Sequence, residues 1–198
     1  MRVIGLTGQT GAGKTTVSSV FKESGFEVIN CDLLARQVVQ AGKPCLKKLA
    51  AHFGGSIVLP NGELDRKLLG GIVFANDEKL ALLNKIIFPY INAELNSRIK
   101  KLEEGHIKLV VLDAPTLFES GTDSLCSEII SVIAPKEVRR ARIIARDSLT
   151  ESAADARMAS QKCDDFYIKR SQYVLRNDGT VAEFTAKAAG IVKELEGA

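Results

Sequence analysis

The chain has 198 residues, of which 45% are hydrophobic and 26% are charged. This composition is typical of a globular protein and excludes a disordered one. The length suits one α/β domain with insertions, or at most two small domains. The net charge of +3 is too small to indicate a nucleic-acid-binding protein.

The cysteines and histidines do not form a metal-binding pattern. They are Cys31, Cys45, Cys126, Cys163, His52 and His106. Because no C-x-x-C pair occurs and the histidines stand alone, we expect reduced thiols in or near the core and no structural zinc. The sequence shows no signal-peptide pattern and no apolar run of the roughly 18–20 residues that a membrane span needs. A cytoplasmic protein without membrane contact is therefore expected.

The N-terminal segment predicts a strand, a loop, a helix and a second strand. Val3–Thr7 is short and apolar, and glycines follow it. Thr15–Ser24 carries apolar residues on one helical face, and Gly25 provides a C-terminal stop. Phe26–Asn30 has the pattern of a second strand. This order favours a parallel sheet.

The segment from about Leu33 to Glu104 is predicted to be mainly helical. Its apolar residues recur at spacings of three and four, and Pro60-Asn61-Gly62 indicates a turn. No strand is predicted here. The segment is therefore interpreted as a helical insertion beside the sheet.

Later segments return to the sheet. Ile107–Pro115 and Glu128–Pro135 are continuous apolar runs that suit strands buried on both faces, and Tyr173–Asn177 is a shorter candidate. A capping box of Thr180 and Glu183 predicts the start of a closing helix. The predicted fold is one α/β domain, a parallel sheet flanked by helices with two helical excursions.

The stretch GQTGAGKT matches the phosphate-loop pattern. Gly8 and Gly13 are separated by four residues, and Lys14 and Thr15 follow directly. Glycines let backbone N–H groups surround phosphate oxygens, and the positive end of the next helix faces the same charge. The competing interpretation, a glycine turn without a ligand, requires all these features to agree by chance. The stretch therefore predicts nucleoside triphosphate binding.

The remaining sequence narrows the class of nucleotide-binding protein. A GTPase would carry Asn-Lys-x-Asp, whereas Asn84-Lys85 lacks the aspartate and does not follow a strand. A motor or transporter ATPase would normally need a longer chain. A small kinase remains.

Several ordered segments resemble one kinase family, the dephospho-CoA kinases. They are GLTGQTGAGKTTV, VINCDLLARQVV, GELDRKLLGGIVF, LNKIIFPYI, VVLDAPTLFESG, RARIIARD, the pair Arg157 and Gln161, and YVLRNDG. The resemblance implies a P-loop kinase fold with a helical acceptor-binding insertion and a helical lid. It also implies ATP-dependent phosphorylation of the ribose 3′-hydroxyl of dephospho-CoA, the last step of coenzyme A synthesis.

The resemblance implies a division of the chain and a set of ligands. The core is expected at about 1–32, 105–140 and 166–198, the insertion at about 33–104 and the lid at about 141–165. The expected ligands are ATP, dephospho-CoA and Mg²⁺, with no nucleic acid. A monomer or a weak homo-oligomer is expected.

The expected catalytic residues are Lys14, Asp32 and Arg142. The expected ATP contacts are Gly11, Ala12, Gly13, Lys14, Thr15, Thr16, Arg142 and Arg146. Thr15 and Asp113 are the expected Mg²⁺ residues, the latter through water. For Asp113, a turn residue at the end of a strand is the alternative.

Arg139, Arg142 and Arg146 recur at spacings of three and four, so they are expected along one helical stripe. The alternative is ordinary surface charge. In a phosphate-loop protein, an arginine that closes over ATP stabilises the transferring phosphoryl group. Arg142 and Arg146 match family arginines, whereas Arg139 stands where the family commonly has glutamine, and Arg142 is the first candidate.

The expected acceptor-binding residues are Asp32, Arg36, Asp65 and Pro89. Asp32 follows a predicted strand, where α/β sheets place ligands, and its carboxylate could accept the proton of the acceptor hydroxyl. The alternative is an N-cap for a helix beginning at Leu33. Arg36 lies one turn further on the same face, and its alternative is a surface arginine.

Two positions near the expected acceptor site depart from the family pattern. Asn30 stands where an aspartate is usual, and Phe88 replaces the histidine of a His-Pro pair. Two other functional classes stay open. One is a kinase for another small metabolite, and the other is a nucleotide-binding switch without an acceptor.

Overall fold

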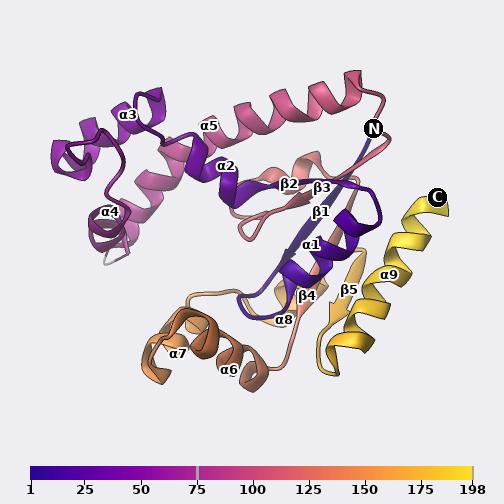
Figure 1. The fold of residues 1–198 in the computed structure, drawn as a ribbon. Helices are drawn as coiled ribbons and strands as arrows, with labels where there is room; N and C mark the ends of the chain where they lie inside the picture. Colours follow the sequence, from indigo (N-terminus) through magenta and orange to yellow (C-terminus); the bar gives the residue numbers. More distant parts are fainter. Residues whose placement is uncertain (75, 198) are drawn as a thin grey trace. The chain divides into compact units, whose positions relative to one another are not determined.

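The structure is a computed structural model that describes residues 1–74 and 76–197. Ala75, inside the predicted insertion, and Ala198, at the end of the predicted core, lie outside the described residues. The strands are β1 (Arg2–Gly8), β2 (Glu27–Asn30), β3 (Leu109–Asp113), β4 (Glu128–Ile133) and β5 (Tyr173–Arg176). The α-helices are α1 (Lys14–Glu23), α2 (Cys31–Gln37), α3 (Pro44–Phe53), α4 (Arg66–Val73), α5 (Asp77–Glu104), α6 (Lys136–Asp147), α7 (Glu151–Ala159), α8 (Asp164–Ile168) and α9 (Val181–Gly197). The 3-10 turns are η1 (Gly55–Ile57) and η2 (Thr122–Leu125) (Figure 1).

The strands form one sheet in the order β2-β3-β1-β4-β5. The β1–β3, β1–β4 and β4–β5 ladders are parallel, which confirms the predicted sheet. Leu6 of the central strand pairs with Asp113 on one side and with Ile130 on the other. The carboxyl ends of β1 and β3 therefore meet at one edge of the sheet, where ligands bind in open α/β sheets.

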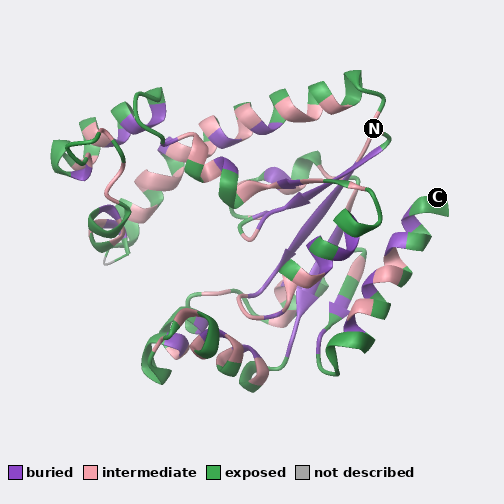
Figure 2. Ribbon diagram, in the orientation of Figure 1, coloured by how far each residue is buried: buried purple, intermediate pink, exposed green. Residues whose placement is uncertain are grey.

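Different segments cover the two faces of the sheet. On one face, Ile4 and Leu6 are fully buried beneath α1 and α9, which pack against each other. Figure 1 shows these two helices side by side, and Figure 2 shows the buried strands behind them. On the other face, a Cβ at Gly5 would lie 2.8 Å from Leu117 Cδ2 and 2.9 Å from Cys126 Sγ. The absence of a side chain at Gly5 thus lets the segment after β3 pack directly on the strand.

The chain divides into two compact units. The nucleotide unit consists of Met1–Ile29 and His106–Ala198, and the helical unit is Asn30–Gly105. The helical unit has its own core between α3, α4 and α5, with Cys45, Leu49 and Ile86 buried in it. It agrees with the mainly helical prediction, since after Asn30, the last residue of β2, its strand-like pairing within the described residues is one isolated bridge between Val58 and Leu64.

Candidate active site

The phosphate loop connects β1 to α1 and is shaped by its glycines. Gly11 and Gly13 have φ of +74° and +107°, in the region that favours glycine. A Cβ at Gly11 would lie 2.8 Å from the carbonyl oxygen of Arg139, and one at Gly13 would lie 2.4 Å from Asn177 Nδ2. Both positions therefore combine a left-handed backbone with neighbours that leave no room for a side chain.

A buried asparagine from beyond β5 holds this loop. Asn177 is 5% exposed, and its Nδ2 donates to the carbonyl oxygen of Ala12 at 2.8 Å. The residues lie 165 positions apart in the chain. From the sequence, Asn177 was expected only at the end of a strand, although it belongs to the segment YVLRNDG, which resembles the family. We interpret it as a structural support for the predicted ATP contacts.

The loop lysine meets the carboxylate at the end of β3. Lys14 Nζ pairs with Asp113 Oδ1, and Asp113 is buried. Thr15 is exposed in the first turn of α1, and no acidic residue occupies that turn. Thr16 donates its backbone N–H to the carbonyl oxygen of Gly13 at 3.0 Å. The positive end of α1, a cation, a hydroxyl and a carboxylate therefore gather at the loop, where an anion and a metal ion could bind.

The three arginines of α6 have different surroundings. Arg139 is buried, donates through Nε to the carbonyl oxygen of Ala134, and has Nη1 buried without a partner among the described residues. Burial lowers its pKa, although the Asp164 carboxylate acts in the opposite direction. Arg142 is half-buried and donates to the carbonyl oxygen of Gly11 and to Asn177 Oδ1, both at 3.3 Å. Of these arginines, Arg142 thus contacts the phosphate loop through its side chain.

Arg146 lies further along α6 and is exposed. Its guanidinium donates twice to its neighbour Asp147, and Arg157 of α7 donates to the same carboxylate at 2.6 Å. The hydrogen bonds from Arg146 are the main reason why the pKa of Asp147 is lowered. A phosphate contact by Arg146 would have to compete with this ion pair.

The segment between α7 and α8 also returns to the phosphate loop. Gln9 is 3% exposed and donates from Nε2 to Asp164 Oδ1 at 2.9 Å and to the carbonyl oxygen of Lys162 at 3.2 Å. Thr10 donates its backbone N–H to Gln161 Oε1 at 3.0 Å. Gln161 appeared in sequence analysis only as part of the family resemblance, and Gln9 filled a variable position of the loop pattern. Both ends of the segment 141–165 are therefore attached to the phosphate loop.

In the helical unit, Asp32 lies in the first turn of α2 and is exposed. The helix begins at Cys31, and its N-cap is Asn30, whose Oδ1 accepts the backbone N–H of Leu33 at 2.9 Å. The N-cap alternative for Asp32 is therefore wrong, because a helix that starts two residues earlier takes its cap from Asn30. The departure at Asn30 thus has a local structural role, and Asp32 keeps its carboxylate available.

The other expected acceptor residues occupy different elements of the helical unit. Arg36 is exposed one turn after Asp32 on α2. Asp65 is the N-cap of α4 and accepts the backbone N–H of Leu68 at 2.9 Å. Pro89 is exposed in the interior of α5. Asp32 and Arg36 share a helical face, whereas the carboxylate of Asp65 already has a capping role.

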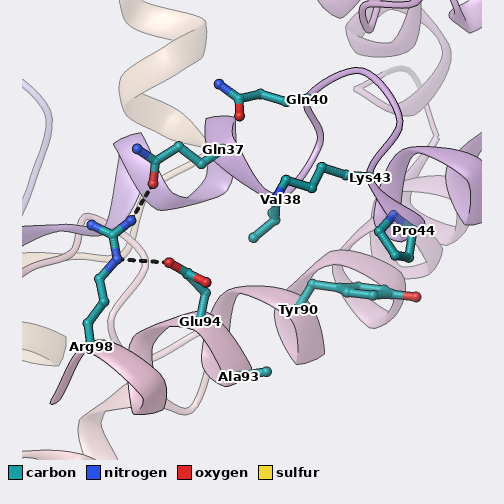
Figure 3. A pocket seen from close by; sticks show the side chains of 9 residues that line it. All are labelled: Gln37, Val38, Gln40, Lys43, Pro44, Tyr90, Ala93, Glu94 and Arg98. Atoms are coloured by element: carbon teal, nitrogen blue, oxygen red, sulfur yellow. Dashed lines mark hydrogen bonds and ion pairs between the residues drawn. The ribbon is translucent and has the colours of Figure 1, made fainter. Parts of the chain in front are cut away.

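A cavity of about 470 Å³ lies within the helical unit, between α2, the start of α3 and α5. Figure 3 shows that Arg98 closes one end of it, held by Gln37 at 2.6 Å and by Glu94 at 3.0 Å. Its other lining residues are Val38, Gln40, Lys43, Pro44, Tyr90 and Ala93. The expected acceptor-binding residues are absent from this lining, although Arg36 and Pro89 are next in sequence to two of its members, Gln37 and Tyr90.

Within residues 1–74 and 76–197, no group of three or more histidine, cysteine or acidic side chains could hold a metal ion by itself. None of the four cysteines, all of which lie in the described part of the chain, forms a disulfide bond. In the same described part, no helix combines the length and the apolar character that crossing a bilayer requires.

Comparison with known proteins agrees with this geometry. A family model described as dephospho-CoA kinase matches residues 2–183. The chain belongs to the dephospho-CoA kinase family. Enzymes of this family catalyse the ATP-dependent phosphorylation of dephospho-CoA that completes coenzyme A synthesis.

Individual relatives and solved structures support the assignment over nearly the whole chain. The dephospho-CoA kinase of Bacillus cereus is 39% identical over 191 residues, covering 96% of each chain. The crystal structure of TT1252 from Thermus thermophilus has a TM-score of 0.82 and 31% identity, covering 98% of this chain and 97% of the other. The dephospho-CoA kinase from Campylobacter jejuni has a TM-score of 0.74 and 28% identity, covering 98% of each. The predicted P-loop kinase fold is therefore confirmed.

Membership of the dephospho-CoA kinase family makes this chain a kinase, as predicted. P-loop kinases that use ATP generally need a divalent metal ion. The individual site residues and the insertion and lid boundaries stay predictions. The structure brings Lys14, Asp113 and Arg142 together around the phosphate loop.

Proposed function

We propose that this protein transfers the γ-phosphoryl group of ATP to the ribose 3′-hydroxyl of dephospho-CoA, giving coenzyme A and ADP. One observation is the main support for this proposal. In a chain of this family, the phosphate loop is flanked by the Lys14–Asp113 ion pair and by Arg142, which donates to the carbonyl oxygen of Gly11. A phosphoryl transferase needs such a loop with positive charge at its edge, because it works mainly by positioning and by stabilising charge.

The loop residues would bind the β- and γ-phosphates of ATP. Residues Gly11 to Thr16 would line these phosphates, and the positive end of α1, together with those of their backbone N–H groups that donate to no carbonyl, would face the phosphate oxygens. Lys14 would exchange part of its interaction with Asp113 for a phosphate oxygen. Arg142, half-buried beside Gly11, would stabilise the charge on the transferring group, and Arg146 would join when released from Asp147.

The same region fits Mg²⁺ as the divalent metal ion. Mg²⁺ prefers oxygen ligands and keeps several waters, and an exposed hydroxyl with a buried carboxylate supplies that donor chemistry. Thr15 would hold the ion directly and Asp113 would hold it through water. When bound, the ion would neutralise phosphate charge and help to orient ATP.

The helical unit would bind the acceptor. Asp32 is exposed, is not used as a helix cap and has Arg36 one turn away, so it is available to orient the 3′-hydroxyl and to accept its proton. Asp65 and Pro89 would contribute further acceptor contacts from the same insertion. The segment 141–165 would close over ATP and exclude water, which limits hydrolysis. The protein would act as a monomer or weak homo-oligomer in the cytoplasm.

The test is ADP release from the purified protein with MgATP and dephospho-CoA, compared with a panel of nucleosides and nucleotides as acceptors. We expect turnover that depends on dephospho-CoA and a product that carries one added phosphoryl group. Lys14→Ala should abolish transfer, while Lys22→Ala, an exposed lysine of the same helix, should leave it within twofold. Turnover only with another acceptor would refute the proposal. ATP binding without turnover of any acceptor would indicate that the protein is a nucleotide-binding switch.

A further inference from the structure

A second arginine lies beside the expected acceptor residue Arg36. Arg66, the first residue of α4, donates from Nη2 to the carbonyl oxygen of Arg36 at 3.4 Å. The two residues are 30 positions apart and belong to the same helical unit. Both are exposed, so a ligand in solution can reach them.

The charges of the two arginines are not neutralised by ion pairs. Among the described residues, neither guanidinium forms an ion pair with a carboxylate. The acidic residues next to Arg66 are already engaged, because Asp65 caps α4 at Leu68 and Glu63 accepts a hydrogen bond from Asn61 at 3.1 Å. Partial burial and the charge of Arg36 hold the pKa of Arg66 below its usual range, against the opposing influence of Glu63. The positive charge of Arg36 thus acts against that of Arg66, and an anion that binds to both guanidiniums would relieve this repulsion.

Guanidinium groups bind phosphate through paired hydrogen bonds, and two of them suit a ligand with more than one negative charge. The proposed acceptor carries a diphosphate on the 5′ side of the ribose whose 3′-hydroxyl reacts. Asp32 and Arg36 share one face of α2, about 6 Å apart along the axis, at 1.5 Å per residue. A hydroxyl near Asp32 would therefore leave the other side of the same ribose near Arg36.

We infer that Arg36 and Arg66 together bind the 5′-diphosphate of the acceptor, with Arg66 as a binding residue that acts on affinity and not on the chemical step. The inference rests on the proposed function, since it takes the acceptor from it. The diphosphate does not change during transfer to the 3′-hydroxyl. Its contacts are therefore equal in the ground state and the transition state, and their loss should raise KM without lowering kcat.

The experiment measures kcat and KM for dephospho-CoA at saturating MgATP in wild type, Arg66→Gln, Arg66→Lys and Lys67→Gln. Lys67 is the matched control, because it is the next residue of α4, is exposed and carries the same charge. We expect Arg66→Gln to raise KM about 10- to 100-fold, the scale of losing charge-assisted hydrogen bonds, with kcat within threefold. Arg66→Lys should recover part of the loss, and Lys67→Gln should stay within twofold.

Adenosine, which has the 3′-hydroxyl but no diphosphate, distinguishes the loss of a diphosphate contact from a general disturbance of the protein structure. Its competition against dephospho-CoA should have the same inhibition constant in wild type and Arg66→Gln, and KM for ATP should be unchanged. An acceptor KM within twofold of wild type in Arg66→Gln, or an equal loss for adenosine and ATP, would overturn the inference. Wild-type protein that turns over another acceptor but not dephospho-CoA would instead refute the proposed function, and would remove the diphosphate site with it.

Discussion

The nucleotide unit and the helical unit hold their candidate residues in different ways. In the nucleotide unit, the phosphate loop is fixed by partners that are far away in sequence, such as Asn177, Gln161 and Arg142. In the helical unit, the turns that carry Asp32 and Asp65 are closed by side chains three residues from their partners. In the first arrangement Asn177 is buried and Gln161 and Arg142 are half-buried, whereas the second leaves Asp32 and Arg36 exposed.

This difference indicates how the candidate residues of each unit respond to substitution. A loop built from long-range hydrogen bonds to buried groups ties activity to global stability, because leaving such a group unpaired costs about 1–3 kcal/mol. An exposed side chain on a locally capped helix can be replaced with little effect on stability. We therefore expect substitutions in the nucleotide unit to affect folding and transfer together, and those in the helical unit to separate them.

The largest expected effect is a loss of kcat, and it tests whether the contacts of one α6 arginine give it a special role in transfer. Arg142→Ala should lower kcat about 10³-fold, the lower end of what a transition-state arginine contributes in GTPases, because it removes the guanidinium beside Gly11. Arg140→Ala is the control, since Arg140 forms surface ion pairs with Glu151 and Asp155, whose loss costs little. ADP release with dephospho-CoA measures both variants. Equal losses would show that α6 contributes only general positive charge.

The next test concerns two neighbouring residues in the helical unit. Asp32→Asn should lower kcat roughly 10²-fold, the lower end of what a general base contributes, without changing stability or the affinity for ATP, because it removes an exposed carboxylate that caps nothing. Asn30→Ala should do the opposite, costing about 1 kcal/mol in the free energy of unfolding with kcat within a few-fold, because it removes the cap of α2. Urea denaturation and ADP release separate the two effects. Near-normal turnover in Asp32→Asn would contradict the role of Asp32 as a general base.

A smaller effect is expected at the support of the phosphate loop. Asn177→Ala should cost about 1–3 kcal/mol in the free energy of unfolding and raise KM for ATP several-fold, because the buried carbonyl oxygen of Ala12 loses its donor. Asn61→Ala, at an exposed turn of the helical unit, should cost less than about 0.5 kcal/mol. Thermal unfolding and ATP titration measure both. A stable Asn177→Ala variant with unchanged KM would contradict the coupling of stability and activity in this unit.

The smallest effect compares two cysteines, one in each unit. Burial raises the pKa of the Cys45 thiol to about 11, whereas Cys163 is exposed. Iodoacetamide at pH 8 should therefore modify Cys163 in the folded protein and Cys45 only after unfolding, because the thiolate is the nucleophile. Mass spectrometry of the labelled peptides measures this. Rapid labelling of Cys45 in the native state would show that the core of the helical unit opens readily.

The raised pKa of Cys45 also has a consequence for stability. The pKa of the thiol is 9.0 in the unfolded chain and about 11 in the folded protein. The folded protein therefore loses stability as pH rises from 9 towards 11, because the unfolded thiol ionises in this range while the buried thiol stays protonated. Wild type should lose more stability between pH 9 and 11 than Cys45→Ala, by urea denaturation at each pH. Equal losses would mean that the thiol is not desolvated in the folded state.

Sequence patterns were sufficient to predict those elements whose structural requirements fall on residues that are close in sequence. The alternation of apolar runs and turns predicted the strands and the parallel sheet, because a buried parallel strand needs continuous hydrophobic residues. The spacing of Gly8, Gly13, Lys14 and Thr15 predicted the loop. The start of α2 was missed by two residues, because Asn30 and Asp32 are both good caps and only the backbone path after β2 decides between them.

What the sequence by itself determined is therefore the parallel sheet, the helical character of residues 33–104 and the phosphate loop, together with the family that their order identifies. The tertiary structure decided which polar side chains meet that loop. Asn177, Gln9 and Gln161 carry no local pattern, and the sequence favoured Arg142 without showing that its side chain donates to the carbonyl oxygen of Gly11. The physical reason is that their partners are more than 100 residues away, and only the assembled sheet and its loops bring them within hydrogen-bonding distance.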